Sequence, residues 1–178
     1  MQSENHSQIL VVDDDPEIVS LLEKLLARTG YRVLKAYSGN EAMRIILEQP
    51  LDLIILDIIL PDINGIWITR RIRQDEKTRM IPIIIITGHR EKELRIKGIE
   101  AGADDFITKP FDIDEILARV RTSLNLSYYR RELHEKKEFD ALIHETVDGV
   151  ILCSADWTIE EMNASARECL NIQEKGEY

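Results

Sequence analysis

Five side chains of this 178-residue sequence carry groups that could handle a phosphoryl group between them. Each lies at the end of a short run of mostly apolar residues: Asp13, Asp14, Asp57, Thr87 and Lys109. Carboxylates crowded together repel one another unless a cation neutralises them, and Mg²⁺ prefers oxygen ligands of this kind. With an ammonium group and a hydroxyl beside them, such carboxylates could pass a phosphoryl group onto an aspartate oxygen. This chemistry requires all five side chains to meet at one place in the fold.

Five apolar runs that alternate with segments of helical periodicity are expected to bring these side chains together. The runs lie at residues 9–12, 32–36, 53–56, 83–86 and 105–108. Continuous apolar runs indicate strands buried on both faces, and their alternation with helices indicates parallel pairing. The sequence therefore predicts an α/β fold, a doubly wound five-stranded parallel sheet with helices on both sides. Ligand sites of such sheets lie at the carboxyl ends of the strands.

Boundary signals and apolar faces support the helices between these runs. Asp15 is expected to cap the first helix and Gly30 to follow its last residue. Leu21 is expected on the apolar face of that helix, together with Ile18, Leu22, Leu25 and Leu26. Two further acids, Asp104 and Asp105, are expected to be loop acids and not ligands.

Four motifs then make the sequence resemble one protein family. They are VVDDD at 11–15, LDIILPDING at 56–65, IIIITG at 83–88 and GADDFITKPF at 102–111. By their order and spacing, residues 8–125 resemble the receiver domain of a two-component response regulator. The resemblance implies a flavodoxin-like fold with strand order 2-1-3-4-5 and a receiver domain over residues 1–126.

The resemblance also implies a role for each acid. Asp57 would accept the phosphoryl group, and Asp13 and Asp14 would hold Mg²⁺ together with Asp57. The backbone carbonyl of Ile59 would complete the protein ligands of the metal. Taken singly, these acids could instead cap a helix or a turn, a role expected here for Asp15 alone.

Further roles follow from the same resemblance. Thr87 would bond one phosphoryl oxygen and Lys109 another, and the peptide bond after Lys109 is typically cis in the family. Phe106 would occupy the position of the switch aromatic, which moves inward as Thr87 moves. An apolar Ile59 and a bulky His89 flank the route of an attacking water, which predicts a moderately long-lived phosphoryl-aspartate.

These roles predict a phosphorylation-dependent signalling switch, which catalyses only its own phosphoryl transfer and slow autodephosphorylation and is otherwise not an enzyme. A sensor histidine kinase or phosphotransfer protein would be the donor, and a linker helix would relay the signal to a downstream output. One alternative is an interaction or dimerisation module that acts without phosphorylation. Another is a phosphohydrolase of the haloacid-dehalogenase type. Those enzymes place two acids two residues apart after the first strand, whereas Asp13 and Asp14 are adjacent.

Composition restricts the partners. The net charge is −10, and acidic side chains outnumber basic ones both in residues 1–126 and in residues 127–178, which opposes binding to a nucleic-acid backbone. No apolar run approaches the roughly 20 residues of a membrane span, and the first residues lack the layout of a signal peptide. The expectation is a soluble, cytoplasmic protein with no membrane or nucleic-acid partner. Cys153 and Cys169 have no partner pair and are expected to be reduced thiols, buried or half-buried.

Residues 127–146 are strongly charged and lack glycine and proline, which predicts that the last receiver helix continues as an amphipathic linker helix. Apolar positions and one threonine recur along it at spacings of three, four and six: Leu126, Tyr129, Leu133, Phe139, Leu142, Ile143 and Thr146. The pattern suggests a parallel homodimer through residues 126–146 or through the last receiver helix, although Lys136 interrupts it. A solvated linker helix is the alternative interpretation.

Residues 147–178 resemble the opening of a PAS sensor domain. Two short strand-like runs flank a turn at Asp156, and Asn163 precedes a small helix. These residues are too few to close a ligand pocket. The expectation is therefore a partial PAS-like α+β segment that belongs to a longer signalling protein.

Overall fold

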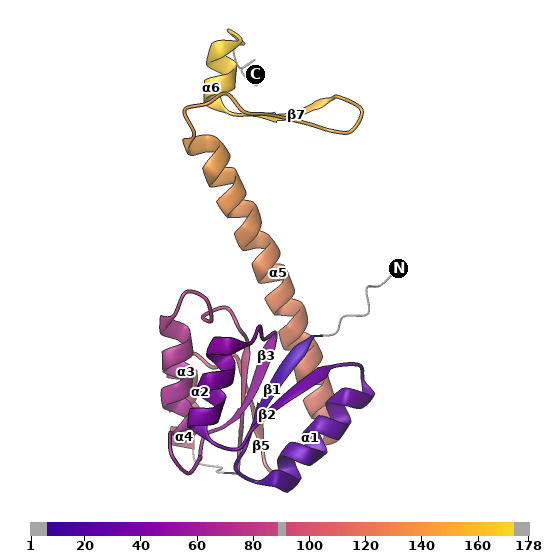
Figure 1. Cartoon of the computed structure of the whole chain (residues 1–178), viewed down its shortest axis with the longest axis vertical. Coiled ribbons are helices and arrows are strands. Elements are labelled where there is room, and N and C mark those ends of the chain that lie inside the picture. Colours follow the sequence, from indigo (N-terminus) through magenta and orange to yellow (C-terminus); the bar gives the residue numbers. More distant parts are fainter. Residues whose placement is uncertain (1–6, 89–91, 173–178) are drawn as a thin grey trace. The chain divides into compact units, whose positions relative to one another are not determined.

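In a computed structural model, which describes residues 7–88 and 92–172, the chain divides into two compact units, Met1–Tyr129 and Arg130–Tyr178. Strands and helices alternate through the first unit (Figure 1). They are β1 (Gln8–Val12), α1 (Pro16–Arg28), β2 (Arg32–Ala36), α2 (Gly39–Glu48), β3 (Leu53–Asp57), α3 (Gly65–Gln74), β4 (Ile83–Thr87), α4 (Lys92–Glu100), β5 (Asp105–Thr108) and the first part of α5 (Ile113–Glu145), which continues into the second unit. Within the described ranges, no helix combines the length and apolar character of a membrane span.

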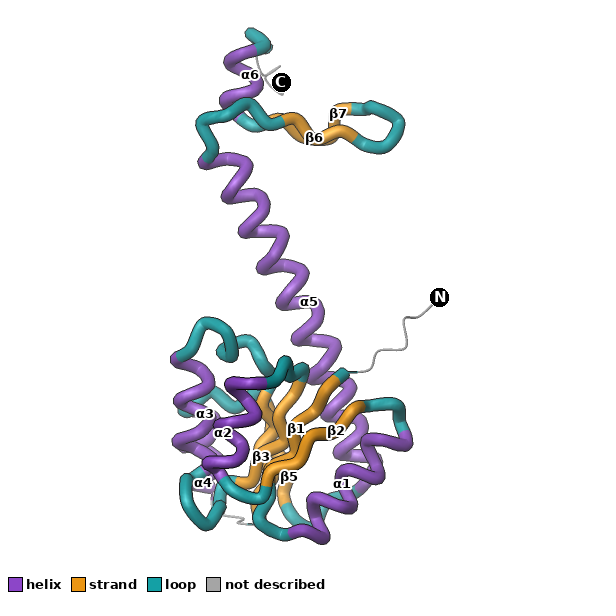
Figure 2. The backbone as a smooth tube through the Cα atoms, viewed as in Figure 1, coloured by secondary structure: helices purple, strands orange, loops and turns teal. Residues whose placement is uncertain are grey.

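The five strands form one parallel sheet in the order β2-β1-β3-β4-β5, which confirms the predicted topology. Figure 2 shows α2, α3 and α4 on one side of the sheet and α1 and α5 on the other. Strands β1, β3 and β4 are buried throughout, as their continuous apolar runs predicted, whereas β2 at the edge is half-buried. Alternate strand residues such as Leu10 and Ile9 enter two separate apolar cores, one on each face.

The ends of the helices follow local rules. The side chain of Asp15 accepts a hydrogen bond from the backbone N–H of Glu17 at 2.8 Å, which confirms the predicted cap of α1. Gly30 follows α1 with a φ of 91°, a conformation that glycine adopts without steric cost. The prediction for Leu21 is wrong, because its side chain is 45% exposed while Leu22 and Leu26 fill the contact with the sheet.

The last receiver helix, predicted to continue as a linker helix through residue 146, is the single α-helix α5. The second unit continues with two antiparallel strands, β6 (Ile151–Cys153) and β7 (Ile159–Met162), and with α6 (Ala164–Cys169). These elements match the two short strands and the small helix that the sequence indicated. Their PAS-like identity stays a prediction, as do the domain limits 1–126, 127–146 and 147–178.

Asn163 is fully buried and joins three segments of the second unit. Its Oδ1 accepts hydrogen bonds from the backbone N–H groups of Val150 and Ala166, each at 2.9 Å. Its Nδ2 donates to the carbonyls of Ile143 at 2.9 Å and Asp148 at 2.8 Å. One side chain therefore ties the end of α5 to the start of β6 and the start of α6.

The prediction of buried or half-buried thiols is wrong, because Cys153 and Cys169 are both exposed. Residues of β6 are alternately exposed and half-buried, and Cys153 lies on the exposed side. Cys169 is the last residue of α6, which buries Ala166.

Candidate functional site

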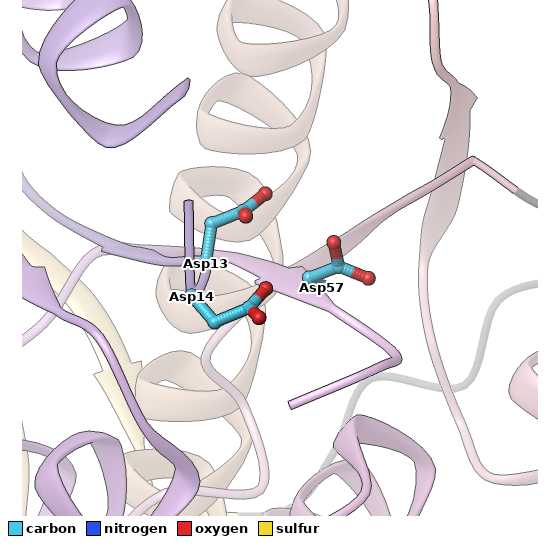
Figure 3. Close-up of side chains that lie close together, drawn as sticks. All are labelled: Asp13, Asp14 and Asp57. Carbon is cyan, nitrogen blue, oxygen red and sulfur yellow. The ribbon is translucent and has the colours of Figure 1, made fainter. Parts of the chain in front are cut away.

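Three carboxylates meet at the carboxyl ends of β1 and β3, where the sequence predicted a site (Figure 3). Asp57 is the last residue of β3, and Asp13 and Asp14 directly follow β1, the strand beside it. One carboxylate oxygen of each acid lies within 4.8 Å of the others. Asp13 and Asp57 are buried, whereas Asp14 is exposed. The cluster is therefore open to solvent on the side of Asp14.

Lys109 places its ammonium group between two of these acids. Its Nζ donates hydrogen bonds to Asp13 Oδ2 at 2.6 Å and to Asp57 Oδ2 at 2.5 Å. Lys109 directly follows β5, and its backbone N–H donates to the carbonyl of Thr87 at the end of β4, at 2.9 Å. The peptide bond from Lys109 to Pro110 is cis, as the resemblance implied. One residue thus connects the ends of four strands.

Burial and pairing act on the charges in opposite directions. Burial raises the pKa of Asp13 above its ordinary value, and hydrogen bonds from Lys109 and from the backbone of Asp15 offset this only in part. Burial also acts to lower the pKa of Lys109, but hydrogen bonds to Asp13 and Asp57 and their charges outweigh it, so this pKa is raised. With three carboxylates around one ammonium group, a further cation would relieve the repulsion.

The donor set fits a hard divalent cation such as Mg²⁺. Because Mg²⁺ binds oxygen at about 2.1 Å, two ligands on opposite sides of it lie about 4.2 Å apart, and the three carboxylate oxygens, all within 4.8 Å of one another, lie near this separation. Two carboxyl groups are already oriented: Asp13 Oδ1 accepts from the N–H of Asp15, and Asp57 Oδ1 from that of Ile59, both at 3.0 Å. The exposed Asp14 completes the set, and the carbonyl of Ile59 as a ligand stays a prediction.

The predicted hydroxyl and aromatic positions lie on the two strands beyond β3. Thr87 ends β4 and is buried, and the preceding residue, Ile86, pairs with Asp57. Phe106 lies in β5 and is half-buried. Thr87 therefore shares the site's edge of the sheet with Asp57, as predicted. His89, expected to influence the lifetime of the phosphoryl group, lies outside the described residues.

Sequence reasoning missed two residues that fix the loop after Asp57. Gly65 begins α3 so close to Asp57 that a Cβ atom at position 65 would lie 2.2 Å from the Asp57 carbonyl oxygen. The N–H of Gly65 also donates to the carbonyl of Ile58 at 2.8 Å. Asp62 accepts hydrogen bonds from the first two backbone N–H groups of α2, at 2.7 and 2.9 Å. The motif at residues 56–65 gave no indication of these contacts.

Neither Asp104 nor Asp105 belongs to the acid cluster, but the prediction of a loop position is wrong for Asp105, which is the first residue of β5. Asp104 Oδ2 lies 2.7 Å from Nη2 of Arg73, and Asp105 Oδ1 lies 2.6 Å from Nη1 of Arg119. The guanidinium of Arg73 also donates, at 2.8–2.9 Å, to the backbone carbonyls of Gly102, Arg79 and Ile81. These acids stabilise the starts of β4 and β5.

The assembled groups can bind a divalent cation together with an anion. A cation held by the acids, the ammonium group of Lys109 and the hydroxyl of Thr87 are the kinds of group that hold phosphoryl oxygens. In such a site the carboxylate of Asp57 is a candidate nucleophile toward phosphorus.

The part of the chain that forms the site is similar to known proteins. The family model of the response regulator receiver domain matches residues 9–121. The DNA-binding dual master transcriptional regulator RpaA of Synechocystis sp. is 41% identical over 117 residues, which are 66% of this chain and 48% of that protein. The response regulator ArlR of Staphylococcus aureus is 45% identical over 118 residues, 66% of this chain and 52% of that protein. The chain thus spans about half the length of these relatives.

Solved structures show the same fold. A two-component response regulator from Clostridium difficile has a TM-score of 0.63 at 29% identity, covering 67% of this chain and 96% of that one. The signal receiver domain of an HD domain-containing protein from Pseudomonas fluorescens Pf-5 has a TM-score of 0.69 at 27% identity, covering 74% and 96%. Both matches lie above the level of a chance likeness in fold.

Proposed function

Because the chain belongs to the response regulator receiver domain family, we propose that it is a phosphorylation-dependent switch whose Asp57 accepts a phosphoryl group. The proposed donor is a phosphohistidine of a sensor histidine kinase or of a phosphotransfer protein. The observation that carries the proposal is the contact of Lys109 Nζ with both Asp13 and Asp57, beside the exposed Asp14. A cation at this point can hold a phosphoryl oxygen next to the carboxylate that attacks.

In the proposed reaction a carboxylate oxygen of Asp57 attacks the phosphorus atom in line with the bond that breaks. A P–O bond forms while the P–N bond of the phosphohistidine breaks, and the histidine nitrogen leaves with the electron pair. Lys109 and the Thr87 hydroxyl hold phosphoryl oxygens during the transfer. Mg²⁺ bound by Asp13, Asp14 and Asp57 would neutralise negative charge on the transferring group. The attacking carboxylate carries no proton, so the site needs no general base.

The proposed consequence is a shift between two packings of the receiver. Thr87 and Phe106 form the switch. A phosphoryl oxygen on Asp57 would attract the Thr87 hydroxyl, and Phe106 lies in β5, the strand that pairs with the strand of Thr87. The change would reach a downstream output through α5. The chain would otherwise catalyse only its own phosphorylation and a slow loss of the phosphoryl group. The expected absence of a nucleic-acid partner stays a prediction.

A homodimer through α5 is the second element of the proposal. Three apolar side chains on successive turns are exposed: Leu126 by 51%, Tyr129 by 61% and Leu133 by 60%. At roughly 100° per residue they lie on one face of the helix, whereas Phe139 and Leu142 turn toward another. We therefore place the contact on the first three and not along all of residues 126–146. Light scattering should show a dimer that Leu133→Glu dissociates, and a wild type that stays monomeric would contradict this contact.

The second unit is proposed to be the opening of a PAS-type sensor domain. The supporting observation is the buried Asn163 between β7 and α6, at the position where the resemblance expected an asparagine. The hairpin of β6 and β7 alone is too small for independent stability, since two strands seldom suffice.

Intact-mass spectrometry after incubation with acetyl phosphate and Mg²⁺ tests the phosphoryl acceptance. The wild type should gain one phosphoryl mass, and Asp57→Asn should gain none while keeping its fold by circular dichroism. Asp15→Asn is the matched control, because Asp15 caps α1 and lies outside the acid cluster. Equal uptake by Asp57→Asn would refute the assignment. Failure of the wild type under every condition would leave an interaction module, and turnover of small phosphomonoesters would indicate a phosphohydrolase.

A further inference from the structure

Helix α4 rests on the sheet through a residue that has no side chain. Among residues 93–100, Gly98 alone is buried and Leu94 is half-buried. Two apolar side chains of this helix, Ile96 and Ile99, are 44% and 56% exposed. By contrast, α1 and α3 each bury three apolar side chains or more. The position of α4 on the sheet therefore depends on which side chain fills the space beside Gly98.

The ring of Phe106 fills that space. A Cβ atom at position 98 would lie 2.5 Å from Cζ and 2.8 Å from Cε1 of Phe106, and 3.1 Å from Cδ1 of Ile85. Non-bonded carbon atoms in contact are ordinarily about 3.5–4.0 Å apart. The ring and a methyl group at position 98 therefore cannot both keep these positions. Glycine is unfavourable inside a helix relative to alanine, and the contact with the ring offsets that disadvantage.

This contact connects α4 to two residues of the site by different routes. Ile85, whose Cδ1 lies beside Gly98, belongs to β4, the strand that ends at Thr87. Phe106 lies in β5, and Lys109 directly follows that strand. The carbonyl of Gly98 also accepts a hydrogen bond from the N–H of Ala103 at 3.1 Å, which attaches the end of α4 to the segment that enters β5. A shift of α4 would therefore act on the hydroxyl and on the ammonium group together.

We propose that Gly98 is a positioning residue for the site. By receiving the ring of Phe106 it sets where α4 lies against β5, and hence where Thr87 and Lys109 lie relative to each other. The functional part of this inference rests on the proposed phosphoryl acceptance at Asp57. Its packing part depends only on the contact between Gly98 and Phe106.

Thermal unfolding of four proteins tests the packing part: the wild type, Gly98→Ala, Phe106→Leu and the double variant. Alanine favours a helix more than glycine does, so Gly98→Ala would raise the Tm if nothing occupied the space. With the ring in place the same change should lower the Tm. Phe106→Leu removes the outer ring atoms, so adding Gly98→Ala to it should no longer lower the Tm. A rise of the Tm on Gly98→Ala in the wild-type background would overturn the packing part.

Phosphoryl uptake from acetyl phosphate tests the functional part. Gly98→Ala should slow uptake at saturating donor by about tenfold, because misplaced groups lose much of their effect. The double variant should match Phe106→Leu, and Lys97→Gln, on the exposed surface of α4, should match the wild type. Wild-type uptake by Gly98→Ala would overturn the positioning role, whereas no uptake by the wild type itself would overturn the proposed function and this role with it.

Discussion

Lys109 Nζ lies within hydrogen-bond distance of both Asp13 and Asp57, although 96 and 52 positions separate it from them along the chain. A single ammonium group is thus shared between two buried carboxylates, and a third carboxylate, that of Asp14, stands beside them at the surface. The stability, metal affinity and reactivity of this edge of the sheet all depend on how the surplus negative charge is balanced. Substitutions of Asp13, Asp14 and Lys109 should change mainly the stability, the metal affinity and the reactivity, respectively.

Replacing Asp13 by asparagine is expected to raise the free energy of unfolding at pH 7 in the absence of metal, because burial disfavours the charged form of this carboxyl group. Burial raises the pKa of Asp13 above 3.8, so the folded protein holds this proton more tightly than the unfolded chain does. Stability from this group is therefore complete below the unfolded pKa and is lost as the pH rises through the folded pKa.

Urea unfolding from about pH 3.5 to pH 7 should show the gap between Asp13→Asn and the wild type opening as the pH rises. The variant keeps an oxygen at Oδ1 for the backbone of Asp15, so the local turn is retained. A variant that is less stable than the wild type at pH 7 would contradict the prediction. So would a difference in the free energy of unfolding that does not change with pH.

Magnesium is expected to raise the Tm of the wild type, and a chelator should reverse the rise. A ligand at a hundred times its dissociation constant stabilises the native state by about 2.7 kcal/mol. Asp14→Asn should abolish most of this stabilisation with little effect on the metal-free protein, because Asp14 is exposed. Calorimetric titration measures the affinity directly, with Asp15→Asn as the control that should bind normally. Equal Mg²⁺ affinity in Asp14→Asn and the wild type would contradict the ligand set.

Lys109→Met should slow phosphoryl uptake by about a hundredfold or more, since removing one stabilising donor from a transition state has an effect of this size. The same change should tighten Mg²⁺ binding, because it removes a cation that shares Asp13 and Asp57 with the metal. Lys109→Arg keeps the charge but not the compact ammonium group, so its rate of phosphoryl uptake should lie between those of the wild type and Lys109→Met. Uptake by Lys109→Met at the wild-type rate would show that the lysine has only a structural role.

Asn163→Ala should open the second unit without disturbing the first. The substitution leaves the backbone groups of Val150 and Ala166 without their side-chain partner, at a cost of about 1–3 kcal/mol. Hydrogen exchange should therefore accelerate at these two amides and in β6, while the amides of β1, β3 and β4 keep their protection. Glu168→Ala, on the exposed side of α6, is the control. Unchanged exchange at Val150 would show that Asn163 does not hold the junction.

Much of the first unit could be predicted because local sequence determined it. A run of apolar residues that ends in Asp57 specifies both a buried strand and a polar group at its end, and the same holds for Asp13 and Thr87. Parallel pairing then brings such ends together whatever the loops between them do. The cap formed by Asp15 needs only its own neighbours, which is why that prediction was confirmed.

The rest depends on contacts between segments that are distant in the sequence. Nothing local to Gly65 or Gly98 reveals that one lies against the carbonyl of Asp57 and the other against the ring of Phe106. Leu21 satisfies the helical period yet is exposed, because Leu22 and its neighbours already fill the contact of α1 with the sheet. The exposure of Cys153 follows from how little of the hairpin is covered, which no residue pattern states.

The hydrogen bonds of Arg73 close the amino ends of β4 and β5, whereas the chemistry lies at the carboxyl ends of the same strands. Substitutions near Arg73 should consequently lower stability, and an osmolyte should restore it. Substitutions among the acids should lower activity, which an osmolyte should not restore. In a library of random variants, whether a substitution is tolerated should then depend on its position along a strand and not on which strand carries it. Substitutions at the amino ends of β4 and β5 would therefore change mainly stability, and substitutions at their carboxyl ends mainly the chemistry of the site.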